Sequence, residues 1–249
     1  MPYFEFDNHQ IFYDTKGNGE DLLLLHGNIA SSVMLESEIN YFSKRYRVTY
    51  FDYPGLGKSA RLEKLSDDFW KYNAKCALEL INFLKIKSTK VIGTSGGAKV
   101  AINLGLISPN LIDKMIADSF FGEYITKEEA DRLRQMRLKG KTQLLHKAFW
   151  QKMHGDDWEH LVDLDIDLMI NTGYKGINPI EGDYSVIDFP VMITASTEDE
   201  LIPNIEERMI PIIEKIRYCE FKLYDKGKHP LMITRKKLFR TIAEEFFDK

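Results

Sequence analysis

The sequence predicts an α/β protein built on a mostly parallel β-sheet, for two reasons. Strand-like apolar segments alternate with amphipathic helical segments from residue 21 to residue 118. The first of these strands, residues 21–25, is a run of leucines after one aspartate, which is typical of a strand buried on both faces of a parallel sheet. Right-handed crossovers bring the carboxyl ends of such strands to one edge of the sheet. We therefore expect the chemistry at that edge.

Turn residues, helix caps and apolar periodicity place the other elements of the first half. Residues 3–6 and 10–13 flank a polar turn and predict an amino-terminal hairpin. Further elements are expected in this order: a helix capped by Ser31 and Ser32 that reaches about residue 44, a strand over residues 46–51, a long helix capped by Ser66, a strand at residues 91–92, a helix that ends at Ser108-Pro109, and a strand over residues 115–118.

From residue 122 to residue 188 the rhythm changes, because helical segments follow one another without a strand. Capping-box patterns begin at Thr126 and Asp156. Three glycines stand where helices would end, namely Gly140, Gly155 and Gly173. We expect about three helices, inserted as a cap (122–188) into a core formed by residues 1–121 and 189–249. The core resumes with a strand over 191–195, a helix over 204–216, a strand over 220–224 and a helix over 231–247.

Composition narrows the classes of function. The 249 residues carry a net charge of -4 with both signs interspersed, which disfavours a nucleic-acid surface. No apolar stretch is long enough to cross a bilayer and the amino terminus lacks a secretory-signal pattern, so we expect a cytoplasmic protein. Cys76 and Cys219 have neither metal-type nor redox-type spacing and are expected to be buried thiols. We expect no metal and no cofactor.

Residues 91–99 contain the pattern Gly-x-Ser-x-Gly centred on Ser95, between a short strand and a helix. This pattern indicates a nucleophile elbow, in which a strained turn lifts the serine hydroxyl above the sheet. Gly93 and Gly97 would leave room for the neighbouring backbone. The alternative is a glycine-rich connection with an incidental serine.

A serine hydroxyl becomes a strong nucleophile only beside a base, and the base needs an acid to orient it. His229 follows the last strand at the carboxyl edge and is the candidate base. Three other histidines fall in the helical insertion, where they are most simply polar positions of amphipathic helices: His146, His154 and His160.

Asp199 is the preferred acid, because it follows the strand over 191–195 at the same edge of the sheet. Glu198 and Asp118 remain alternatives. Two backbone N–H groups are expected to stabilise the oxyanion, those of Gly96 at the positive end of the helix and of Asn28 after the first buried strand.

Gly57-Lys58-Ser59 has the ending of a phosphate-binding loop. The first glycine of that motif is replaced by Asp52, whose charge would repel phosphate, so a nucleotide site is disfavoured. His26 is expected to hold its loop in shape rather than to bind a metal.

Taken together, these residues resemble the α/β-hydrolase fold family over nearly the whole chain. The similar segments are His26-Gly27-Asn28, residues 52–59, residues 93–97, residues 199–203 and residues 227–229. The resemblance implies an eight-stranded, mostly parallel sheet with helices on both faces, a helical cap after the sixth strand, and a triad of Ser95, Asp199 and His229. His26-Gly27-Asn28 is also similar to the loop of haloalkane dehalogenases, but those enzymes use an aspartate nucleophile where this chain has Ser95.

The expected function is hydrolysis of a small carboxylic ester through an acyl-enzyme. A thioesterase, a lactonase and a carbon–carbon bond hydrolase are alternatives on the same residues, and a non-catalytic ligand receptor is an alternative of another class. The substrate group and the oligomeric state are not predicted, nor are the cap residues that line the pocket.

Overall fold

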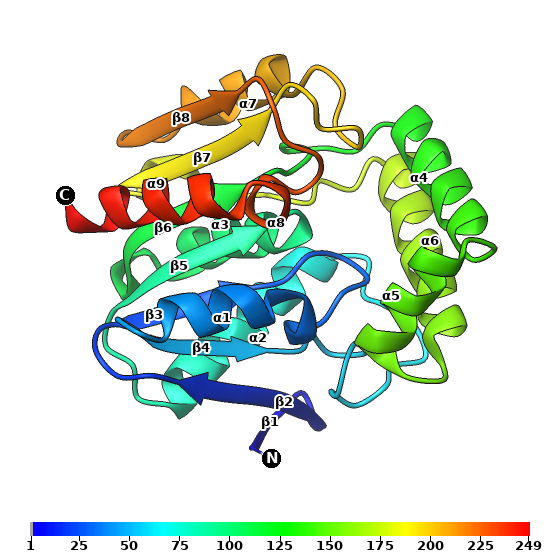
Figure 1. The fold of residues 1–249 in the computed structure, drawn as a ribbon, viewed down its shortest axis with the longest axis horizontal. Coiled ribbons are helices and arrows are strands. Elements are labelled where there is room, and N and C mark those ends of the chain that lie inside the picture. Colours follow the sequence, from blue (N-terminus) through cyan, green and yellow to red (C-terminus); the bar gives the residue numbers. More distant parts are fainter. Residues whose placement is uncertain (1) are drawn as a thin grey trace.

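The structure, a computed structural model, describes residues 2–249 and contains an eight-stranded sheet in the order β1-β2-β4-β3-β5-β6-β7-β8 (Figure 1). The strands from β4 to β8 are parallel, whereas β1 and β2 pair antiparallel at one edge. This confirms the predicted fold class. The strands are β1 (Tyr3–Phe6), β2 (His9–Lys16), β3 (Asp21–Leu25), β4 (Arg47–Phe51), β5 (Thr89–Thr94), β6 (Ile112–Asp118), β7 (Val191–Ser196) and β8 (Cys219–Tyr224).

Helices cover both faces of the sheet, with α1 and α9 on one face and α2 and α3 on the other (Figure 1). The helices are α1 (Glu36–Phe42), α2 (Phe69–Phe83), α3 (Gly96–Ile107), α4 (Lys127–Gly140), α5 (Leu144–His154), α6 (Trp158–Lys175), α7 (Ile205–Ile213), α8 (Leu231–Thr234) and α9 (Lys236–Asp248). Short 3-10 turns η1 (Ser32–Leu35), η2 (Pro109–Leu111) and η3 (Tyr184–Val186) complete the structure.

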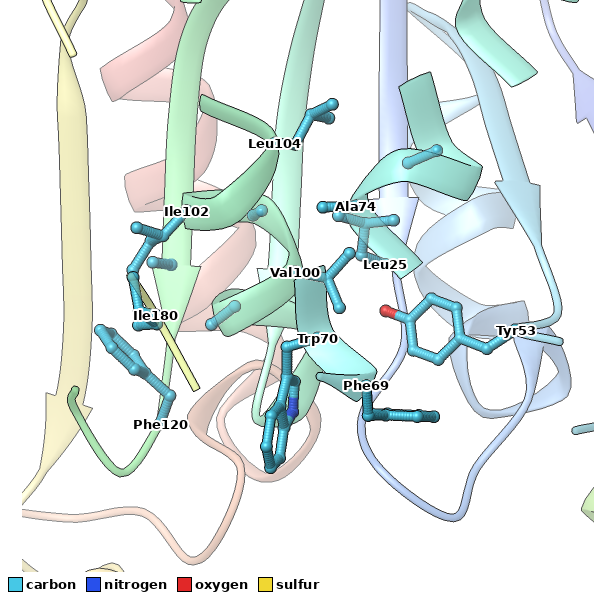
Figure 2. Close-up of a cluster of buried hydrophobic side chains, with 14 of the residues drawn as sticks. Leu25, Tyr53, Phe69, Trp70, Ala74, Val100, Ile102, Leu104, Phe120 and Ile180 are labelled. Carbon is cyan, nitrogen blue, oxygen red and sulfur yellow. The ribbon is translucent and has the colours of Figure 1, made fainter. Parts of the chain in front are cut away.

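The leucines of β3 explain why this strand is central. Leu23 and Leu25 pack into the core under α2 and α3, while Leu22 and Leu24 pack into a second core under α1 and α9. Figure 2 shows part of the first core, where Leu25 lies near side chains of α2 and α3. Because alternate residues of a strand face opposite sides, only an all-apolar strand can serve both cores.

Helices α4, α5 and α6 follow β6 and lie together beyond the arrowheads of the parallel strands, at the carboxyl edge of the sheet (Figure 1). Thr126 and Glu129 form the predicted capping box at the start of α4. The rings of Trp150 and Trp158 stack at 5.7 Å and join α5 to α6. This placement puts three helices directly over the edge at which the site residues were expected.

Several predicted helix ends were wrong. Asp68, not Ser66, precedes α2, and the Ser66 hydroxyl donates to the Asp68 side chain instead of capping the helix. No side-chain cap bond forms at Ser31. Asp157, not Asp156, precedes α6, and no capping box forms there.

Gly173 lies inside α6, where a side chain would approach within 2.8 Å of the Ala130 Cβ, and Gly176 ends the helix in the left-handed conformation. The expected closing helix is divided into α8 and α9 at Arg235, whose backbone is not helical. Cys76 is buried as expected, whereas Cys219 is only half-buried because β8 is the edge strand.

Candidate active site

Ser95 occupies the turn between β5 and α3 in a strained conformation, with φ of 55° and ψ of -122°. Its backbone N–H donates to the Asp118 carbonyl at 2.7 Å, which ties the turn to the end of β6. A Cβ at Gly93 would collide with the Gly97 carbonyl, and one at Gly97 would collide with the Leu25 carbonyl. The two glycines therefore allow the close packing that this turn requires.

His229 lies in the loop between β8 and α8 and reaches both of its expected partners. Its Nε2 atom is 2.8 Å from Ser95 Oγ, and its Nδ1 atom is 2.8 Å from Asp199 Oδ2. The other carboxylate oxygen of Asp199 accepts from the backbone N–H groups of Leu201 and Ile202, at 2.9 and 3.2 Å. The structure thus brings together the three predicted residues, and backbone donors hold the carboxylate in place.

Neither alternative acid makes this contact. Asp118 is fully buried and accepts from Thr94 Oγ1 at 2.8 Å, Thr194 Oγ1 at 2.7 Å and the Met232 N–H at 3.1 Å. Burial raises the pKa of Asp118, although these donors lower it in part. Glu198 is exposed. The role of Asp118 is to join β5, β6 and β7 to the start of α8.

The two residues predicted to supply the oxyanion donors lie next to each other. A Cβ at Gly96 would collide with the Asn28 side chain and lie 3.0 Å from the Asn28 backbone nitrogen. Within residues 2–249 neither of these two N–H groups donates a hydrogen bond. The Asn28 side chain is held on both sides, because its Oδ1 accepts from Trp70 Nε1 at 3.1 Å and its Nδ2 donates to Asp165 Oδ1 at 3.3 Å.

His26 supports the loop that carries Asn28. Its Nε2 accepts from the Tyr53 N–H at 3.3 Å, and its ring lies 3.9 Å from the Tyr53 ring. The Tyr53 hydroxyl donates back to the His26 carbonyl at 2.8 Å. Burial lowers the pKa of His26, although the negative charge of Asp52 opposes this shift. The lowered pKa favours the neutral ring, which is the form that can accept this bond.

The segment that ends in Gly57-Lys58-Ser59 binds its own carboxylate. Asp52 accepts from the Ser32 N–H at 2.6 Å and from the Lys58 N–H at 2.8 Å. A phosphate would need backbone donors of this kind, and here Asp52 already occupies them.

In the part of the chain that the structure describes, no group of three or more His, Cys, Asp or Glu side chains is arranged to hold a metal.

A small cavity of about 30 Å³ lies beside Ser95, between the core and the helices above it. Its lining residues are Asn28, Trp70, Ser95, Gly96, Lys99, Phe121, Ile125, Leu133, Arg137, Met169 and Leu201. Larger hollows of about 340 and 450 Å³ contain none of the three predicted catalytic residues. A space of 30 Å³ holds about two water molecules, so the site is almost filled by its own side chains.

Lys99 is a residue of this cavity that the sequence interpretation missed. It is 2% exposed and its Nζ atom has no hydrogen-bond partner among the described residues. The atom lies 4.5 Å from the centre of the Trp70 ring and 5.7 Å from that of Phe121. Burial, and secondarily the charge of Arg208, lower the pKa of Lys99 to about 7.

Cation–π contact alone does not balance the burial of Lys99. Such contacts contribute about 0.5–2 kcal/mol, whereas removing an ammonium from water costs several kcal/mol even after relaxation. Lys99 stands four residues after Ser95, in the first turn of α3, and this nearness to the elbow serine was the signal that could have identified it.

His154, predicted as a polar position of an amphipathic helix, is instead buried. It is 5% exposed, and its Nδ1 accepts from the Gly57 N–H at 3.2 Å. Burial lowers its pKa to about 4. Arg61 donates to the His154 carbonyl at 2.8 Å and pairs with Asp157, so α5 is fastened to the loop that follows β4.

The similarity in sequence to known proteins is clearest over the first half of this chain. The sequence model of the alpha/beta hydrolase fold matches residues 22–145. The (E)-2-((N-methylformamido)methylene)succinate hydrolase of Acinetobacter baylyi is 31% identical over 111 residues, which are 44% of this chain and 41% of that protein. The match therefore spans less than half the length of this relative.

Two further similarities extend over nearly the whole chain. The mouse protein named serine hydrolase BPHL is 23% identical over 251 residues, covering 95% of this chain and 82% of that protein. The solved structure of Est816, described as an N-acyl homoserine lactone degrading enzyme, has a TM-score of 0.77 and 20% identity, and the match covers 98% of this chain and 100% of that one.

Among residues 2–249, no helix has the length and apolar character needed to cross a membrane.

Proposed function

Because the chain belongs to the α/β-hydrolase fold family, we propose that it is a serine hydrolase that cleaves a small carboxylic ester. The observation that carries this proposal is the unbroken chain of contacts from Asp199 through His229 to Ser95, with 2.8 Å at both steps. Such a chain prepares a hydroxyl to attack a carbonyl carbon.

In the first half of the reaction, Ser95 Oγ attacks the ester carbonyl while His229 Nε2 takes the hydroxyl proton. Asp199 keeps the other ring nitrogen protonated and stabilises the imidazolium that forms. The N–H groups of Gly96 and Asn28 donate to the oxyanion. His229 then gives its proton to the departing alcohol, which leaves an acyl group on Ser95.

In the second half, a water molecule replaces the alcohol. His229 removes a proton from this water, the hydroxide attacks the acyl carbonyl, and the Ser95 oxygen leaves as the proton returns to it. The carboxylic acid product and the free enzyme result. No cofactor is needed for either half of this reaction.

Residues 122–188 are proposed to act as a cap over a core of residues 1–121 and 189–249. Ile125, Leu133, Arg137 and Met169 from this segment line the cavity beside Ser95. The cavity of about 30 Å³ is smaller than an ester substrate, so substrate entry requires α4 and α6 to shift away from the core.

A panel of p-nitrophenyl esters, a p-nitrophenyl thioester and a lactone tests this function. The wild type should release product over many turnovers, and Ser95→Ala should lower kcat by about 10⁴-fold or more. Ser88→Ala is a matched control, because Ser88 is exposed and precedes β5, at the opposite end of that strand from Ser95. Full activity in Ser95→Ala would overturn the proposal, and one product per protein molecule would favour the receptor alternative.

A further inference from the structure

Lys99 is a buried lysine whose amino group forms no ion pair or hydrogen bond among the described residues, and the Glu129 carboxylate that favours its charged form is already paired with Arg208. The other buried or half-buried cations near it are paired: Arg137 with Asp165 at 2.9 Å, and Arg208 with Glu129 at 2.8 Å. Lys99 Nζ has no hydrogen-bond partner within residues 2–249 and faces aromatic rings. An uncompensated buried charge in a cavity is stabilised when an anion enters that cavity.

The position of Lys99 relates this charge to the reacting serine. Both residues line the same cavity; Ser95 directly precedes α3 and Lys99 lies in the first turn of that helix. A helix rises about 1.5 Å per residue, so the two backbone positions are separated by about 6 Å along the axis. A group bound to Ser95 therefore needs only a few carbon atoms to reach the ammonium.

Arg137 lines the same cavity but is engaged elsewhere. Its Nε donates to Asp165 Oδ2 at 2.9 Å, and Asp165 Oδ1 accepts from the Asn28 side chain at 3.3 Å. Arg137 thus positions the oxyanion loop through Asp165, and its charge is already compensated. Lys99 is then the unpaired basic group among the described lining residues, and its ammonium form matches a group with a single negative charge.

The cavity holds the acyl part of the substrate in preference to the alcohol part. It is lined by Ser95, Gly96 and Asn28, whereas His229 is not among its lining residues. The departing alcohol must face His229 to receive its proton. The group that extends toward Lys99 is therefore the acyl chain.

We propose that Lys99 binds a carboxylate at the far end of the acyl chain, so that the preferred substrates are half-esters of short dicarboxylic acids. This inference rests on the proposed serine-hydrolase function, because it defines the acyl group by its attachment to Ser95. Lys99 is a binding and specificity residue, and the reacting groups remain Ser95, His229 and Asp199.

The test compares two esters of the same length, mono-p-nitrophenyl glutarate and p-nitrophenyl valerate, which differ only in a terminal carboxylate or methyl group. The wild type should prefer the glutarate by at least tenfold in kcat/KM. Lys99→Met should lower this preference by at least tenfold. Lys75→Met, which changes an exposed lysine of α2, should leave the preference as in the wild type. An equal preference in wild type and Lys99→Met would overturn the inference.

Binding to Ser95→Ala separates this inference from the proposed function and covers the case in which Lys99→Met does not fold. Calorimetry should show that monomethyl glutarate binds Ser95→Ala at least tenfold more tightly than methyl valerate. Equal affinities would overturn the role of Lys99 even if ester hydrolysis depends on Ser95. Conversely, undiminished hydrolysis by Ser95→Ala would overturn the serine mechanism while the glutarate preference still reports on Lys99.

Discussion

The Nε2 atom of His229 lies 2.8 Å from the Oγ atom of Ser95, although 134 positions separate the two residues in the chain. The parallel sheet makes this contact possible, because β5 and β8 both end at the same edge. The Nδ1 atom of the same ring contacts Asp199, from the loop after β7. Three strand ends therefore supply one chain of hydrogen-bonded side chains.

The first prediction separates the two candidate acids. Asp199→Asn should lower kcat by about 10⁴-fold, because an amide favours the wrong tautomer of His229. Asp118→Asn should mainly reduce stability, because the amide cannot accept all the hydrogen bonds that Asp118 accepts from Thr94, Thr194 and Met232. Kinetics on esters and thermal unfolding of both variants distinguish these effects. A larger loss of kcat in Asp118→Asn than in Asp199→Asn would contradict the assignment.

The second prediction concerns the packing of the elbow. Gly97→Ala should lower the free energy of unfolding by more than about 2 kcal/mol, since its Cβ would collide with the Leu25 and His26 carbonyls. Gly155→Ala is the comparison, because Gly155 has a φ of +85° and open space around it, and it should cost about 1 kcal/mol. Urea unfolding measures both, and a smaller effect at Gly97 than at Gly155 would contradict the tight packing.

The third prediction is a pH dependence of stability that belongs to Lys99. Its pKa is about 7 in the folded protein and near 10.5 when unfolded. Between these values the unfolded chain binds more protons, so the contribution of Lys99 to stability rises with pH. Below about pH 7 both states are protonated, and the folded protein bears the full penalty of a buried charge.

Lys99→Met should therefore be more stable than the wild type at pH 6.5, and this advantage should shrink as the pH rises toward 10. Urea unfolding of both proteins across this range provides the measurement. Other lysines titrate equally in the two proteins and cancel in the difference. A difference that does not change with pH would contradict the burial of a titrating ammonium.

The fourth prediction concerns His154, which joins α5 to Gly57. Its pKa is about 4 when folded and near 6.5 when unfolded, so the unfolded chain binds more protons between these values. The contribution of the neutral His154 ring to the free energy of unfolding is fully present above pH 6.5 and is lost as the pH falls toward 4. His154→Asn keeps an acceptor without titrating, so it should lose less stability than the wild type over this range. An equal loss in both would be evidence against this contact.

Much of the fold was predictable because it depends on local patterns. Buried parallel strands are apolar throughout, and the elbow glycines stand at fixed positions around Ser95. The acid was harder to assign, since Asp118 and Asp199 both follow a strand at the same edge. Only the packed structure distinguishes them, because the donors that surround Asp118 come from β5, β7 and α8.

Lys99 and His154 could not be assigned from periodicity, because their burial depends on segments distant in the chain. Lys99 is covered by Trp70 of α2 and by Phe121, and His154 by the loop around Gly57. Helix ends were also less predictable than helix existence. A serine or aspartate near a helix start offers a cap, but the packing of the first turn decides whether it is used.

The most direct test of the central claim is labelling with a fluorophosphonate, which reacts only with an activated nucleophile, followed by peptide mass spectrometry. The wild type should carry the label on Ser95, and His229→Ala should react at least 10³-fold more slowly because the hydroxyl then lacks its base. Labelling at another residue, or equal rates in wild type and His229→Ala, would contradict the account.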